Sequence, residues 1–255
     1  MVDDQRVSLS SALLRSAHGD AWQAEGRLRA PFGGGAAEIR GARMMASGLP
    51  VPKWNNADIV SADVSVDALQ AWYAERDVPW GIRVPLELNF HLGEPLFEKR
   101  CAGLLRDVLR PAAAVTGVSI HRASPADLPA YAAVELAGFG SEDPELERRW
   151  LEPAMGAPGF DHWIAEAADE AVGVAMTLRT AGRAGPAAYL GGVAAVPGWQ
   201  GKSLEAMLAS RAATEALNAG AAFVHFNPDE DELGWASEIG FVTVPGFLVR
   251  VVRPE

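Results

Sequence analysis

The chain of 255 residues is long enough for one large domain or two small ones. Apolar residues make up 49% and charged residues 22%, which excludes a wholly disordered chain, and no apolar run is long enough for a membrane span. The net charge of −11, with three scattered lysines, argues against a nucleic-acid partner and is compatible with a cationic substrate such as an amine.

The N-terminus opens on acidic residues and lacks the pattern of a secretion signal, and the single cysteine, Cys101, excludes an internal disulfide. We therefore expect a soluble cytoplasmic protein in which Cys101 is a small core residue rather than a nucleophile. No Cys and His residues have the spacing of metal ligands, so no metal is expected.

The N-terminal part of the chain has an uneven pattern, with turn residues between short apolar segments. Its expected elements, in chain order, are a helix over 7–25, strands over 37–46 and 59–64, a helix over 66–76 with Ser65 as its N-cap, a strand over 80–90 and a helix over 96–109.

The residue pattern changes near residues 111–117, where small residues precede an alternating apolar segment. We expect a boundary there between domains over 1–117 and 118–255. The expected elements of the second domain are a strand from 118, helices over 124–136 and 144–151, a hairpin of strands over 163–167 and 171–178, a strand over 187–196, a helix over 201–219, a strand over 222–226, a helix over 229–238 and a closing hairpin over 241–252.

The segment with the most chemical information runs from Val193 to Leu208 and has the pattern of a buried strand, a Pro-Gly break, a polar turn and a helix. Amides at the start of a helix are unpaired donors, and the helix dipole adds partial positive charge there. An anion, above all a phosphate, is the natural occupant. A turn that merely connects a strand to a helix is the alternative.

This segment and the order of elements after residue 118 resemble the GNAT superfamily of N-acyltransferases. The family has a Gln/Arg-x-x-Gly-x-Gly/Ala turn, then an Asn after the next strand and a Gly-Phe pair; Gln200 begins the turn, Asn227 follows the strand, and Gly240 and Phe241 form the pair. The resemblance implies an α/β (α+β) fold with a mixed, mostly antiparallel twisted sheet flanked by helices. It also implies a smaller, degenerate lobe of the same kind at the N-terminus.

In that family the turn holds the pyrophosphate of acetyl-CoA, and the preceding strand pairs with the pantetheine arm. Carried over by position, the residues expected to bind the acyl-CoA co-substrate are Val193, Ala194, Ala195, Gln200, Gly201, Lys202, Ser203, Leu204, Glu205 and Asn227. Ser203 and Glu205 replace small residues of the family pattern, and a carboxylate near a diphosphate is repelled by it.

In that family a Tyr commonly protonates the leaving thiolate, and Ala236 stands at its position in this chain. The acid–base residues are therefore relocated or absent. His225 on a strand beside the cleft, Asp229 near a helix start and Glu135 on the first helix of the second domain are the catalytic candidates. A structural His, a helix cap and a solvated helix face are the respective alternatives.

The sequence therefore predicts an acyl-CoA-dependent N-acyltransferase that acts on a small-molecule amine by direct transfer. One or more of Trp54, Trp72, Trp80 and Trp235 is expected to line the acceptor pocket. The alternative is a degenerate protein of this fold that binds a small molecule or an acyl carrier without transfer, or that has a repurposed reaction. The sequence leaves the oligomeric state open, a homodimer included.

Overall fold

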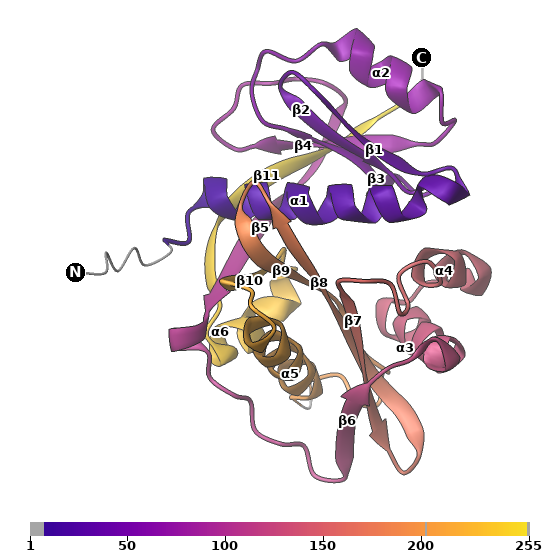
Figure 1. The fold of residues 1–255 in the computed structure, drawn as a ribbon, viewed down its shortest axis with the longest axis vertical. Helices are drawn as coiled ribbons and strands as arrows, with labels where there is room; N and C mark the ends of the chain where they lie inside the picture. Colours follow the sequence, from indigo (N-terminus) through magenta and orange to yellow (C-terminus); the bar gives the residue numbers. More distant parts are fainter. Residues whose placement is uncertain (1–7, 202, 254–255) are drawn as a thin grey trace.

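The structure is a computed structural model that describes residues 8–201 and 203–253. Within these residues eleven strands form one sheet in the order β1-β2-β3-β4-β11-β5-β10-β9-β8-β7-β6. The pairs β3–β4 and β9–β10 are parallel and the other neighbours are antiparallel. Helices flank the sheet (Figure 1). The predicted α/β fold, with a mostly antiparallel sheet flanked by helices, is confirmed.

The elements have the following bounds along the chain. The strands are β1 Gly35–Ile39, β2 Ala42–Ala46, β3 Asn55–Ile59, β4 Trp80–Pro85, β5 Glu94–Leu105, β6 Val118–Arg122, β7 Phe160–Ala167, β8 Glu170–Gly182, β9 Gly185–Ala195, β10 Phe223–Phe226 and β11 Val242–Val252. The α-helices are α1 Ser11–Arg29, α2 Val66–Ala74, α3 Leu128–Phe139, α4 Pro144–Leu151, α5 Leu204–Asn218 and α6 Leu233–Ile239, and none of these described helices is long and apolar enough to cross a membrane.

The C-terminal part of the sheet buries both of its faces. Alternate side chains of a strand point to opposite faces, and β9 follows this rule: Ala195 packs in the cluster that contains α5, and Ala194 packs in the cluster that contains α3. In Figure 1, α5 accordingly lies on one side of β8 and β9, and α3 and α4 lie on the other. This arrangement leaves the ends of β9 and β10 as the place where a site can form.

The N-terminal part packs α2 against β1–β4. The Ser65 hydroxyl accepts a hydrogen bond of 3.3 Å from the Ala68 amide, so the predicted N-cap of α2 is confirmed. Tyr73 stacks on Trp80 with 4.3 Å between ring centroids, and its hydroxyl donates to the Met45 carbonyl at 3.0 Å. Helix α1 then crosses from this part to β8 and β9, so one helix contacts both halves of the sheet (Figure 1).

The two halves of the chain exchange strands at the centre of the sheet. Strand β5 lies between β10 and β11, and β11 lies between β4 and β5. The helix predicted over 96–109 is wrong, because residues 101–104 are buried and both edges of this segment find hydrogen-bond partners in β10 and β11. The predicted closing hairpin is also wrong: β11 is one strand with a bulge at residues 245–246.

Two further differences lie in the N-terminal part. The single strand predicted over 37–46 is a hairpin of β1 and β2, which turns at Gly41 with φ of 82°. The strand predicted over 59–64 is shifted toward the N-terminus, since β3 pairs with β2 from Asn55 to Ile59. The division of the chain at residue 117 stays a prediction, and the exchanged strand β5 precedes that point.

Candidate functional site

A groove forms where the parallel strands β9 and β10 diverge. Their pairing covers only Ala187–Tyr189 and Phe223–His225. The free end of β9, the turn before α5 and the residues after β10 enclose a space of about 490 Å³, which we name the C-terminal groove. Its lining residues are Gly138, Phe139, Val193, Ala194, Ala195, Gln200, Gly201, Ser203, Glu205, Asp229, Asp231, Glu232, Trp235 and Glu238.

A β-bulge interrupts β9 beside this groove. Val174 of β8 pairs with Ala194 and Met176 pairs with Gly191, so Gly192 and Val193 stand opposite a single residue. Gly192 has φ of 58°, and a Cβ atom there would overlap the carboxyl of Glu135. Glycine at this position therefore both permits the bulge and makes room for the carboxyl group.

The start of α5 supplies free backbone donors to the groove. The Met207 amide donates to the Ser203 carbonyl, and the amides of residues 204 and 205 precede the helical ladder in the described part of the chain. Ser203 has φ of 62°, a left-handed conformation that favours glycine. The Gln200 amide group donates to the carbonyls of Gly138 and Ala195, each at 3.2 Å, and so ties the turn to α3 and β9.

Carboxyl groups dominate the charge of the C-terminal groove. Five line it: Glu205, Asp229, Asp231, Glu232 and Glu238. Burial raises the pKa of Glu232 to about 7, so part of this charge titrates near neutral pH. The groove thus offers helix amides to an anion and, at the same time, surrounds it with like charge.

A second cavity, of about 150 Å³, lies on the other side of the bulge between the two halves of the chain. We name it the aromatic–carboxyl cavity. Its walls come from α1, α3, α4, the 3-10 turn before β3 and strands β7–β9, and are formed by Trp22, Glu25, Arg29, Lys53, Trp54, Glu135, Phe139, Glu147, Trp150, Leu151, Ala154, His162, Met176, Tyr189, Gly191 and Gly192. The volume corresponds to roughly five water molecules, enough for the amine end of a small ligand.

Two buried carboxyl groups, Glu135 and Glu147, face each other in this cavity. Their residues are only 4% and 5% exposed. Burial, together with a hydrogen bond and the charge of Glu147, raises the pKa of Glu135 well above its usual range. Glu135 therefore keeps its proton at pH values where an exposed glutamate has lost it, and its carboxylate, once formed, is the stronger base. A group of this kind can accept a proton from an ammonium ion.

The aromatic wall is a stack of rings with a cation at each end. The Arg29 guanidinium lies 3.8 Å from the Trp150 ring centroid, Trp150 stacks on Trp54 at 4.7 Å with an interplanar angle of 6°, and Lys53 lies 5.0 Å from the Trp54 ring. The carboxyl of Glu25 pairs with Arg29, so one of the two cations is already neutralised. The stack joins α1, α4 and the N-terminal part of the sheet, and so fixes the shape of the cavity.

The fold can be compared with known proteins at this point. A GCN5-related N-acetyltransferase from Kribbella flavida superposes with a TM-score of 0.66 at 14% identity, over 92% of this chain and 93% of that chain. A putative acetyltransferase of the GNAT family from Novosphingobium aromaticivorans superposes with a TM-score of 0.59 at 14% identity, over 96% of this chain and 100% of that chain. The chain has the GNAT fold. No family model matches the sequence, and no curated protein matches it.

The GNAT fold places most of the predicted donor-binding residues around the C-terminal groove. Val193, Ala194, Ala195, Gln200, Gly201, Ser203 and Glu205 line it. The side chain of Leu204 is fully buried in the core instead, so only its backbone faces the turn. Lys202 lies outside the described residues. Asn227 points to β5, where its amide group donates to the Arg100 carbonyl at 3.0 Å and to the Cys101 sulfur at 3.3 Å.

The three predicted catalytic residues of the GNAT fold lie in different places. Glu135 lines the aromatic–carboxyl cavity, and the alternative of a solvated helix face is wrong because the side chain is buried. His225 is 1% exposed beneath Tyr189, lines neither space in the described part of the chain, and has a pKa lowered to about 3 by burial. Asp229 lies at the groove, pairs with Lys99 and caps the turn before α6, so its role as a cap is confirmed.

Several residues of the cavity have no counterpart among the predicted site residues. Glu147 and Trp150 stand on α4, whose approach to α3 depends on packing and leaves no motif in the sequence. Trp54 was expected near an acceptor and lines the cavity, and Trp235 lines the groove, whereas Trp80 packs in the N-terminal core. Among the described residues no group of three or more His, Cys, Asp or Glu side chains is placed to hold a metal ion.

Proposed function

We propose that this chain is an N-acyltransferase that transfers an acyl group from a thioester in the C-terminal groove to a small amine in the aromatic–carboxyl cavity. The observation that carries the proposal is the position of the Glu135–Glu147 pair beside the bulge at Gly192. Groove and cavity adjoin there, because Phe139 lines both and successive residues of β9 line one and then the other.

The cavity suits a cationic amine that must lose a proton. The carboxyl groups of Glu135 and Glu147 accept hydrogen bonds from an ammonium group, and the ring edges of Trp54 and Trp150 contact the apolar part of the amine. In its ionised form Glu135 then takes a proton from the bound amine, since burial makes its carboxylate more basic than an exposed one. The neutral amine is the nucleophile that attacks the thioester carbonyl. Orientation in a closed space favours this step because it replaces a bimolecular encounter.

The groove holds the acyl donor in this proposal. The free edge of Val193–Ala195 pairs with an extended pantetheine arm, and the free amides at the start of α5 face the diphosphate of acetyl-CoA. The bulge interrupts the β8–β9 ladder at residues 192–193, and in this proposal a backbone amide there donates to the carbonyl oxygen as it gains negative charge. Carboxylates of the groove weaken the affinity for the diphosphate.

The transfer balances without a further reactant. A bond forms between the amine nitrogen and the acyl carbon, and the carbon–sulfur bond breaks. The ammonium ion loses two protons, the first to Glu135 before the attack and the second from the nitrogen to water after it. The thiolate leaves and takes a proton from water. A side chain at residue 236 cannot donate that proton, because this residue is a buried alanine.

The second candidate is ligand binding without transfer. Two features that disfavour a bound diphosphate favour it: the five carboxylates of the groove and the left-handed backbone conformation of Ser203. One experiment separates the two. The protein is incubated with acetyl-CoA and a panel of aliphatic and aromatic amines, and released thiol is measured beside the binding of each amine by calorimetry. Thiol release that depends on an amine supports transfer. Amine binding without thiol release supports the second candidate, and the absence of both contradicts both.

A further inference from the structure

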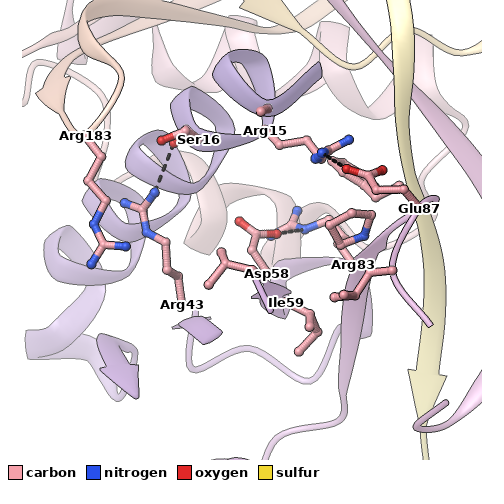
Figure 2. Close-up of a pocket in the computed structure, with 13 residues that line it drawn as sticks. Arg15, Ser16, Arg43, Asp58, Ile59, Arg83, Glu87 and Arg183 are labelled. Atoms are coloured by element: carbon pink, nitrogen blue, oxygen red, sulfur yellow. Dashed lines mark hydrogen bonds and ion pairs between the residues drawn. The ribbon is translucent and has the colours of Figure 1, made fainter. Parts of the chain in front are cut away.

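The N-terminal half contains a third space, which we name the arginine cavity (Figure 2). It lies where the second parallel pair diverges: β3 and β4 pair only over Asn56–Asp58 and Gly81–Arg83. Beyond these pairs, the strand ends enclose about 430 Å³ together with α1 and the β8–β9 turn. Its lining is therefore built at the same kind of strand divergence as the C-terminal groove, but from different elements.

The charge of this cavity is opposite in kind to that of the C-terminal groove. Four guanidinium groups line it, from Arg15, Arg43, Arg83 and Arg183, against two carboxylates, from Asp58 and Glu87. Figure 2 shows these arginines around one space. Two more carboxylates pair with the arginines from outside the lining. Those two belong to Asp20, on Arg43, and Glu38, on Arg43 and Arg183.

The ion pairs of the four arginines differ in how easily an incoming anion can replace them. Arg43 pairs with Asp20 at 2.5 Å, and Arg83 pairs with Asp58 at 2.6 Å, in positions where the arginines are almost fully buried. Arg15 and Arg183 instead pair with the exposed carboxylates of Glu87 and Glu38. Exposed pairs contribute about 0–1 kcal/mol, so a ligand anion can take over these two arginines at little cost.

Two guanidinium nitrogens of the cavity lack a hydrogen-bond acceptor in the described part of the chain, Nε of Arg43 and Nη2 of Arg83. Nη2 of Arg83 is buried without a hydrogen-bond partner, although Nε of the same group donates to Asp58. A buried N–H group without an acceptor is unfavourable, and it is satisfied when an acceptor is brought to it. Nη2 of Arg83 has no exposed surface, and the Arg83 guanidinium lies 4.6 Å from the Trp22 ring centroid, so Arg83 adds positive charge to the cavity wall while Nη2 itself stays out of direct reach of a bound anion.

We propose that the arginine cavity binds an organic phosphate whose non-phosphate part is compact and apolar. Guanidinium groups bind phosphate oxygens through paired hydrogen bonds, and Arg15 and Arg183 are the two whose partner carboxylates are exposed, although Arg15 also donates to the Gly246 carbonyl at 3.2 Å. The apolar part contacts the remaining wall, formed by Ile59, Val60, Pro85, Leu88 and Phe247. The volume of about 430 Å³ corresponds to roughly fourteen water molecules, enough for a phosphate and one ring.

The test is a titration of the full chain with phenyl phosphate, followed by calorimetry, with inorganic phosphate and benzyl alcohol as comparison ligands. We expect phenyl phosphate to bind more tightly than inorganic phosphate and benzyl alcohol not to bind. Arg15→Gln and Arg183→Gln should each weaken the binding of phenyl phosphate about tenfold. The control Arg148→Gln, on the surface of α4, should leave this binding unchanged.

Three results would overturn the proposal. The first is that phenyl phosphate does not bind to the unmodified chain. The second is that it binds to both variants with unchanged affinity. The third is that it binds no better than inorganic phosphate, because the apolar part of the ligand would then contribute nothing to binding. Thermal unfolding of each variant checks that it is folded. This readout is direct binding, so it is independent of acyl transfer, and either proposal can fail without the other.

Discussion

Glu135→Gln separates the chemical role of the carboxyl pair from its structural role. Glutamine keeps the shape of the side chain and still makes a hydrogen bond to Glu147, so the cavity should retain its form. It cannot accept the amine proton. Loss of a general base lowers a rate about 10²- to 10⁴-fold, which corresponds to about 3–5 kcal/mol of transition-state stabilisation. We therefore expect kcat to fall by this factor while amine binding persists.

The same substitution changes how the stability of the fold depends on pH, and the burial of Glu135 decides the direction of this change. Because the pKa of Glu135 is raised in the folded chain, the folded state keeps a proton that the unfolded chain releases above its ordinary value of 4.5. Stability is therefore lost as the pH rises from that value toward the raised pKa. Glutamine does not ionise, so the variant should lose less stability between pH 5 and pH 8 than the unmodified chain.

Two measurements check these expectations. Thiol release from acetyl-CoA at saturating amine gives kcat, and urea unfolding at both pH values gives the free energy of unfolding. Glu152→Gln is the matched control, since Glu152 lies just after α4, is exposed and pairs with Arg148. An unchanged kcat in Glu135→Gln, or a variant that loses more stability with rising pH than the unmodified chain, would refute the reasoning.

Three further predictions concern the groove and the cavity. Gly192→Val should abolish transfer and cost about 1–3 kcal/mol of stability, because a β-branched residue at φ of 58° is strained and overlaps Glu135; equal melting temperatures would contradict it. Trp54→Leu should raise KM for the amine, since it removes a stacked ring worth about 0.5–1.5 kcal/mol, with KM for acetyl-CoA as the internal control. Glu232→Gln should strengthen the binding of acetyl-CoA at pH 8 about fivefold, since like charges at about 4 Å in water repel by about 1 kcal/mol. The same variant should bind acetyl-CoA equally at pH 6 and pH 8, whereas the unmodified chain should bind it more tightly at pH 6, where Glu232, with a pKa of about 7, is protonated; calorimetry that finds the reverse order would exclude this account.

The sequence was informative where local signals decide the structure. Ser65 caps α2 as expected, α4 runs over the predicted residues Pro144–Leu151, and the strand, turn and helix around Gln200 follow the predicted order. Each of these depends on neighbours within a few positions, such as a cap, a proline at a helix start or a glycine in a turn.

Residues whose surroundings come from distant segments were not predictable in this way. Strand β5 resembles a helix in its spacing, and only the presence of β10 and β11 on its two edges makes it a strand. Glu135 was a candidate because it stands on a predicted helix, but its partner Glu147 depends on how α4 packs against α3. His225 was a candidate because it stands on a predicted strand, but its burial to 1% exposure depends on distant residues such as Tyr189, whose ring centroid lies 5.5 Å away.

The exchange of β5 and β11 has a consequence for the order in which the chain acquires structure during synthesis. Strand β4 obtains its second neighbour only when residues 242–252 have been made, although its other neighbour, β3, precedes it in the chain. Until then the newly made N-terminal segment exposes an unpaired strand edge, which other chains can bind. The sheet is therefore complete only after this late segment has been made. A chain truncated before residue 242 lacks β11, so β4 and β5 each keep one unpaired edge.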